Sequence, residues 1–95
     1  MSKTEYSVTL MVPVNNMDEW SAVNEKVDKI DATWHSAGTG YGYRDHEWAM
    51  KTKKSALELG NKLMHAFEHI NGSCVQVTNG SRLLLKLGEL QDVDV

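Results

Sequence analysis

Apolar and polar side chains alternate from Tyr6 to Val14. Tyr6, Val8, Leu10 and Val12 fall on one face of an extended chain, which is the period of a half-buried strand. Pro13 cannot donate to a strand ladder, so it marks the end of the strand or an edge position. The pattern therefore predicts a first strand with one solvated side.

A helical pattern follows this strand. Asn15-Asn16 supplies capping side chains, and Asp18 and Glu19 stand where the helix dipole favours acids. The apolar residues then recur at spacings of three and four, which makes a single stripe on a helix. This stripe consists of Trp20, Val23, Val27 and Ile30. We expect the helix to end at Asp31.

The next region predicts a hairpin, with strands over Ala32–Ser36 and Tyr43–Lys51 joined by a glycine-rich loop. In the second strand, one face carries alternate residues that begin with Arg44 and His46 and continue to Trp48 and Met50. Trp48 and Met50 represent the buried side. We expect incomplete burial of Arg44 and His46, because they approach the loop.

A second helix is indicated by an apolar stripe that consists of Ala56, Leu59, Leu63, Ala66, Phe67 and Ile70. Ser55 and Glu58 have the spacing of a capping box at its start. Asn71-Gly72 supplies the left-handed stop at its end.

The last elements form another hairpin. Cys74–Thr78 is a strand, and Asn79-Gly80 is a strong signal for a tight turn. We expect Ser81–Leu87 to be the partner strand, although Leu83, Leu87 and Leu90 also fit a short helix.

The resulting order is β-α-β-β-α-β with an extra C-terminal β-strand. It is compatible with an α+β, ferredoxin-like split βαβ sandwich, in which two helices cover one face of an antiparallel sheet. The 95 residues suit a single domain. We expect a folded core over residues 6–88, with residues 1–4 and 89–95 loose.

Composition narrows the classes of function. The formal charge of −3 and the pI of about 5.7 disfavour a protein that neutralises many phosphates, so nucleic acid is the less favoured partner. Cys74 is the single cysteine, which leaves no intramolecular disulfide. No signal peptide or membrane-spanning run is visible. We expect a cytoplasmic protein with no membrane contact and no cofactor.

The segment Ser36–Trp48 combines glycines, tyrosines and ionisable residues. Glycine weakens strands and exposed aromatic residues are costly to order, so this mixture favours a working surface over simple packing. We expect a contact hairpin for a partner protein, formed by Tyr41, Tyr43, Arg44, Asp45 and His46. The alternative is a flexible turn with a polar strand.

Leucines occupy both faces of the expected last strand. Because the helices cover one sheet face only, Leu83, Leu85 and Leu87 predict an apolar surface for a homodimer or a partner. Equally, the C-terminal tail could fold over them.

Thr39-Gly40-Tyr41-Gly42-Tyr43 resembles the strand-three signature of RNA-recognition-motif domains. Those domains share the β-α-β-β-α-β order, and the resemblance implies base stacking on sheet aromatics. The sequence departs from the signature at Thr39, where a basic residue is usual, and at Arg44 and His46, where apolar and aromatic residues are usual. Met11 also stands in the first strand where an aromatic residue is expected.

Other chemistry-bearing pairs have simpler interpretations. His65 and His69 have a spacing that can hold a metal, but they lie opposite the apolar stripe, which indicates a solvated face and no metal. Asp45 and Glu47 share a strand face without any sign of a cleft that would raise a carboxyl pKa. We expect no catalytic residues.

These observations lead to three hypotheses. The first is a small non-enzymatic protein-binding module, a regulator or inhibitor that acts through the hairpin of residues 38–48 and the leucine strand. The second is single-stranded nucleic-acid binding through Tyr41 and Tyr43. The third is a small dimeric ferredoxin-like enzyme that binds a ligand between sheet and helices with Trp34, His35 or His46, which rests on fold analogy.

Overall fold

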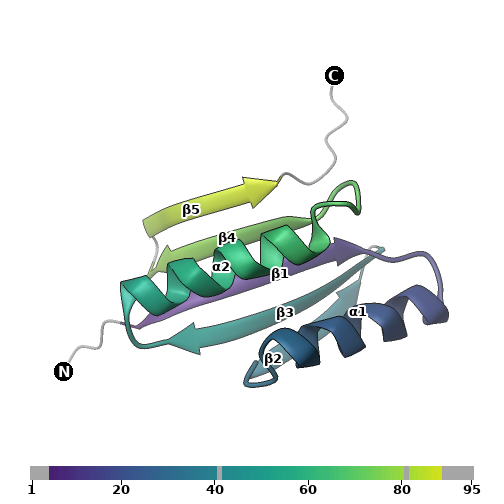
Figure 1. Cartoon of the computed structure of the whole chain (residues 1–95), viewed down its shortest axis with the longest axis horizontal. Coiled ribbons are helices and arrows are strands. Elements are labelled where there is room, and N and C mark those ends of the chain that lie inside the picture. Colours follow the sequence, from purple (N-terminus) through teal and green to yellow (C-terminus); the bar gives the residue numbers. More distant parts are fainter. Residues whose placement is uncertain (1–4, 41, 81, 89–95) are drawn as a thin grey trace.

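The computed structural model describes residues 5–40, 42–80 and 82–88, and these form five strands and two helices (Figure 1). The expected loose ends, residues 1–4 and 89–95, lie outside the described part. In chain order the elements are β1 (Tyr6–Pro13), α1 (Met17–Ile30), β2 (Ser36–Gly40), β3 (Tyr43–Met50), α2 (Lys53–Phe67), β4 (Cys74–Asn79) and β5 (Arg82–Gly88).

The strands form one antiparallel sheet in the order β2-β3-β1-β4-β5. Both helices pack on the same face, α1 toward the β2–β3 half and α2 across β1 and β4 (Figure 1). This confirms the predicted α+β fold, which is consistent with a ferredoxin-like sandwich with an added edge strand. The other face of the sheet, here called the open face, carries no helix.

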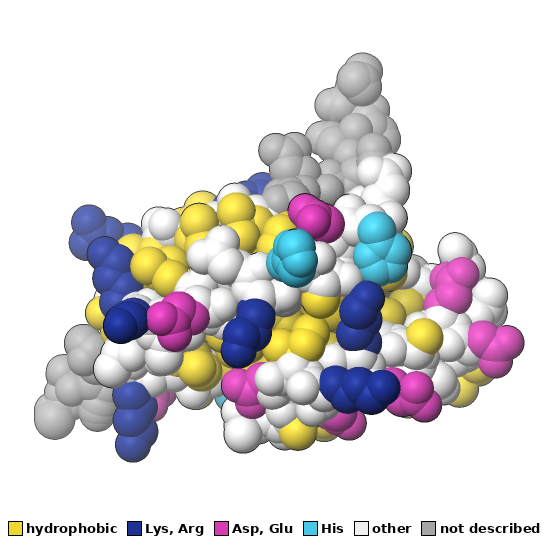
Figure 2. Space-filling model, in the orientation of Figure 1, with side chains coloured by type: hydrophobic (Ala, Val, Ile, Leu, Met, Phe, Trp, Pro, Cys, Tyr) yellow, Lys and Arg dark blue, Asp and Glu magenta, His cyan; other side chains and the backbone are white. Residues whose placement is uncertain are grey.

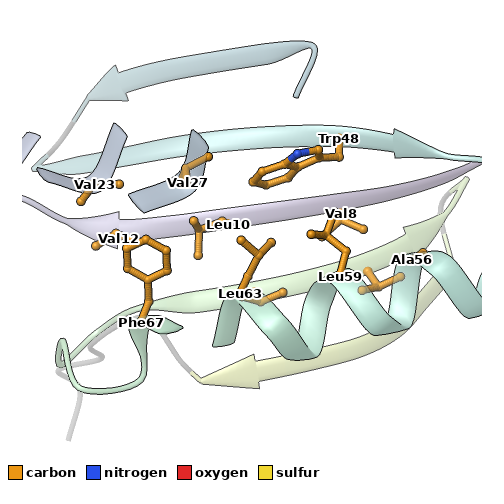
Figure 3. Close-up of a cluster of buried hydrophobic side chains, with 12 residues drawn as sticks. Val8, Leu10, Val12, Val23, Val27, Trp48, Ala56, Leu59, Leu63 and Phe67 are labelled. Carbon is orange, nitrogen blue, oxygen red and sulfur yellow. The ribbon is translucent and has the colours of Figure 1, made fainter. Parts of the chain in front are cut away.

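The core lies between the helices and the helix-covered face of the sheet (Figure 3). Alternate residues of β1 (Val8, Leu10 and Val12) are fully buried there, as the period-2 pattern predicts. The apolar stripes of α1 and α2 pack against these β1 residues. Gly60 allows α2 a close approach to the sheet, because a Cβ at this position would lie 3.0 Å from Val77 Cγ2.

The predicted cap at the start of α1 is correct, whereas the caps predicted for α2 are not. Asn16 caps α1 by accepting a hydrogen bond from the Glu19 amide at 2.9 Å, as expected. The predicted capping box at Ser55 is wrong, because α2 begins at Lys53 and Thr52 is its N-cap. The Thr52 hydroxyl accepts from the Ser55 amide at 3.1 Å. The predicted stop at Asn71-Gly72 is misplaced, because α2 already ends at Phe67 with Glu68 as its C-cap, and Gly72, with a φ of 95°, lies in the turn before β4.

The predicted strand over Ala32–Ser36 is wrong. The strand runs from Ser36 to Gly40, and its glycines are ladder residues that were expected in the loop. The reason is the turn at Gly42, which has a φ of 82°. Such a turn requires both strands to pair up to it, so pairing with β3 extends β2 to Gly40.

The segment after the Asn79-Gly80 turn is strand β5 and forms no helix. An irregularity in the β4–β5 pairing at Val77/Thr78 shifts its register. Leu85 and Leu87 pair with core residues of β4 on the helix-covered face. Leu83 instead pairs with Thr78 on the open face and is 53% exposed. The three leucines therefore do not form one surface.

Neither described helix has the length and apolar content needed to cross a lipid bilayer.

Candidate functional site

The strand period divides the predicted contact hairpin between the two faces of the sheet. On β3, Arg44 and His46 pair with the core residues Val12 and Leu10 and point toward the helices. Tyr43 and Asp45 therefore point to the open face. Tyr41 lies outside the described residues. The structure does not bring the described members of the hairpin together on one surface.

His46 is buried, with 1% of its surface exposed. The expectation of incomplete burial is wrong for this residue, because the chain after α1 brings Trp34 over it. The Trp34 and His46 rings meet edge-on with centroids 5.2 Å apart, and the Trp48 ring stacks on His46 with centroids 6.0 Å apart. Nδ1 of His46 has no hydrogen-bond partner. Burial, helped by the nearby charge of Arg44, lowers the His46 pKa to about 4.

Arg44 is half-buried and joins α1 to the hairpin. Its guanidinium carbon lies 4.6 Å from the centroid of the Trp20 ring, and its Nε donates to Asn24 Oδ1 at 2.8 Å. Its Nη1 donates to the Gly38 carbonyl at 3.2 Å and to Thr39 Oγ1 at 3.1 Å. These contacts already use most of the donors of the side chain, which makes Arg44 a packing element of the helix-covered layer.

Tyr43 and Asp45 remain half-buried on the open face, next to the β2–β3 turn. The Tyr43 hydroxyl lies 4.0 Å from the position that a Cβ on Gly72 would take. The Asp45 carboxylate leans over Gly38, where an added Cβ would lie 3.2 Å from Oδ1. Their role in binding a partner stays a prediction.

The stretch that resembles an RNA-recognition motif spans a turn. Thr39 and Gly40 end β2, and Tyr43 begins β3. The middle of β3 presents Asp45 and Glu47 on the open face, paired with Met11 and Thr9 of β1. Negative charge thus occupies the part of the sheet where the resemblance implies base stacking.

His65 on α2 and His69 in the turn after it are both exposed, and His65 Nδ1 lies 3.7 Å from Glu68 Oε2. Over residues 5–40, 42–80 and 82–88, no group of three or more His, Cys, Asp or Glu side chains could hold a metal ion. Of the residues suggested for a ligand site between sheet and helices, His35 is exposed whereas Trp34 packs on buried His46.

A concave site lies elsewhere, between the first half of α1 and the end of α2. This interhelical groove has a volume of about 360 Å³. Figure 2 shows hydrophobic side chains between the two helices, flanked by Lys and Arg. The groove is lined by Pro13, Asn15, Glu19, Ala22, Val23, Lys26, Phe67, His69, Ile70 and Asn71.

The groove combines an apolar floor with a cation. Val23 and Phe67 are almost fully buried beneath it, and Ile70 is half-buried. The Lys26 ammonium lies 5.1 Å from the centroid of the Phe67 ring, a cation–π distance. At the far end, Glu19 Oε1 accepts from the Asn15 amide at 2.8 Å, so its carboxylate is engaged in capping α1.

Sequence reasoning did not identify this groove. Its residues come from three separate parts of the chain, and the gap between the helices depends on how each one seats on the sheet. The available signal was weak: Ala22 and Lys26 border the Val23 stripe of α1, and Ile70 extends the α2 stripe beyond the helix end at Phe67.

The chain matches no protein-family model, no curated protein and no solved structure. The function is therefore inferred from the geometry of the groove and from the chemistry of its residues.

Proposed function

We propose that this chain is a non-enzymatic protein-binding module, a regulator or inhibitor that acts by occupying a surface of its partner. The interhelical groove receives an apolar side chain of the partner, and Lys26 pairs with an acidic residue beside that side chain. The observation that carries this proposal is the position of Lys26 over Phe67, at the wall of an apolar groove.

The apolar floor supports an anchor of the leucine or phenylalanine type. Ala22 and Ile70 present carbon surface above the buried Val23 and Phe67, and a partner side chain gains free energy by removing this surface and its own from water. A groove between two helices suits one face of an amphipathic helix, whose apolar residues recur at three and four positions.

The charge of Lys26 supports an acidic neighbour for that anchor. No carboxylate of the described residues lies within ion-pair distance of its ammonium. A glutamate on the partner, one helical turn from the anchor, would supply the missing counter-charge. Glu19 also lines the groove, but it competes only weakly with a partner carboxylate for Lys26, because hydrogen bonds from Asn15 already hold the Glu19 carboxylate.

The hairpin offers less support than the groove. Arg44 is held by Trp20, Asn24 and Thr39, and His46 is sealed beneath Trp34. Nucleic-acid binding at the open face would place phosphates near Asp45 and Glu47, which costs electrostatic free energy.

The experiment is a titration of the labelled protein with an amphipathic helical peptide of about 14 residues, followed by amide NMR. The peptide carries a leucine stripe flanked by glutamates. We expect shifts concentrated at Ala22, Lys26 and Ile70. Ala22→Arg should abolish these shifts by blocking the groove, whereas Ser21→Arg, the matched change on the neighbouring exposed residue of α1, should leave them intact.

Two outcomes would overturn the proposal. One is binding that is equally strong in Ala22→Arg. The other is a set of shifts centred on Tyr43 and lost in a Tyr41→Ala/Tyr43→Ala variant, which would return the contact to the hairpin.

A further inference from the structure

The open face carries a row of side chains with opposite charges at its two sides. The register places Glu47 on β3, Thr9 on β1, Gln76 on β4 and Lys86 on β5 side by side. Residues directly opposite in an antiparallel pair point to the same face. The row therefore reads negative, polar, polar, positive across the sheet.

The neighbouring row also has polar side chains in its middle, but its two ends are apolar. It contains Ala49 on β3, Ser7 on β1, Thr78 on β4 and Leu83 on β5. Small hydroxyl residues occupy the middle, and apolar side chains occupy both sides. Leu83 is 53% exposed, one of two large hydrophobic side chains exposed to this extent in the described part of the chain.

The opposite charges of the first row cannot meet within one chain. Three strand spacings separate β3 from β5, which is about 14 Å between Glu47 and Lys86. Accordingly, no ion pair involves either residue among the described carboxylates and cations.

We propose that the open face packs against the same face of a second copy, about a twofold axis parallel to the strands that runs between β1 and β4. This axis places β3 over β5 of the other copy and β1 over β4. Glu47 then faces Lys86 of the second copy, Thr9 faces Gln76, and Ala49 faces Leu83. Every contact occurs twice, as an isologous interface requires.

Packing geometry is compatible with these pairs. Sheets that pack face to face lie about 10 Å apart and are rotated by about 30°. Glu47 and Lys86 each stand about 7 Å from the axis, so the rotation displaces them by about 4 Å. The long side chain of Lys86 covers this displacement. The interface lies on the opposite side of the sheet from the interhelical groove, and it is independent of the proposed function.

Charge reversal tests the interface by sedimentation equilibrium. We expect the wild-type chain to be a dimer. Glu47→Lys and Lys86→Glu each replace two attractive contacts by two repulsive ones, so each should raise the dimer dissociation constant at least about tenfold. The double variant Glu47→Lys/Lys86→Glu should recover the wild-type constant, because the pairs are restored with exchanged signs.

Leu83→Asp, which places a carboxylate against Ala49 of the second copy, should give a monomer with unchanged circular dichroism. Glu58→Lys, on the exposed surface of α2, is the matched control and should leave the dimer unchanged. A wild-type chain that is monomeric overturns the proposal. The proposal is also overturned if the double variant dimerises as weakly as the two single variants, because Glu47 and Lys86 would then not face each other across the interface.

Discussion

The rings of His46 and Trp34 meet edge-on, with centroids 5.2 Å apart and an interplanar angle of 79°. Trp34 belongs to the connection between α1 and β2, and its Nε1 donates to Asp28 Oδ1 at 3.0 Å. The contact closes the helix-covered layer above β3. It explains why a histidine near a hairpin turn is buried with a nitrogen that makes no hydrogen bond.

This burial predicts a pH dependence of stability. The His46 pKa falls from 6.5 to about 4, because burial and the charge of Arg44 outweigh the opposing charges of Asp28 and Asp45. The unfolded chain binds the proton at the higher pH, so folding is destabilised as pH falls. Keeping His46 neutral costs no stability above pH 6.5. Between pH 6.5 and pH 4 it lowers the free energy of unfolding by an amount on the order of 3 kcal/mol.

Urea denaturation of the wild type and of His46→Phe between pH 7.5 and 4.5 measures this contribution. Phenylalanine keeps an aromatic ring in contact with Trp34 and Trp48 and removes the titration, so the stability of His46→Phe should fall less with acid. His65→Phe, at an exposed helix position, should follow the wild-type curve. Parallel curves for wild type and His46→Phe would refute this explanation.

The contacts of Arg44 predict that lysine cannot replace it. Lysine loses the forked donors that reach Asn24, Gly38 and Thr39 and stacks less well on Trp20. We expect Arg44→Lys to lower the free energy of unfolding by about 1–3 kcal/mol. Arg82→Lys, at an exposed position of β5, should change it by less than about 0.5 kcal/mol. Equal effects in chemical denaturation would show that the guanidinium contacts are not structural.

The close approach of α2 to β4 predicts that Gly60→Ala destabilises the fold. Alanine favours a helix over glycine by about 1 kcal/mol. At this position, however, its Cβ would lie 3.0 Å from Val77 Cγ2 and 3.5 Å from Val75 Cγ1. Overpacking of this kind costs about 1–3 kcal/mol, so the melting temperature should fall. Gly40→Ala, with no atom within 4 Å, is the control that should be nearly neutral. A more stable Gly60→Ala protein would contradict the packing described for α2.

The helix caps give a further prediction. Thr52→Ala removes the oxygen that accepts from the Ser55 amide, and it should cost about 1 kcal/mol. Ser55→Ala should cost less, because the Ser55 side chain caps no backbone amide. The reverse order in thermal denaturation would support the capping box predicted at Ser55.

Local patterns predicted those parts of the fold that depend on one segment at a time. The alternation of β1 and the Asn16 cap of α1 depend on nearby residues alone, and both were predicted correctly. The extent of β2 was predicted wrongly, because glycine is a poor strand former and only pairing with β3 makes Gly38 and Gly40 strand residues. The register shift that turns Leu83 away from Leu85 also arises from pairing.

The candidate site was harder to predict for the same reason. The ionisable residues of the hairpin suggested a surface, yet the alternation of β3 sends Arg44 and His46 inward, where α1 contacts Arg44 and Trp34 packs on His46. The groove requires the relative placement of α1, α2 and the end of β1, which no single periodicity encodes. Burial of a polar side chain under a neighbouring tryptophan likewise depends on tertiary contact.

The most direct test of the proposed function exchanges charges across the groove. The glutamate-flanked peptide and a matched lysine-flanked peptide are titrated against the wild type and against Lys26→Glu. We predict that the wild type prefers the glutamate peptide by about tenfold and that Lys26→Glu reverses this preference, since each match pairs opposite charges. Equal affinities of both proteins for both peptides would contradict the proposal that Lys26 and the groove bind the partner.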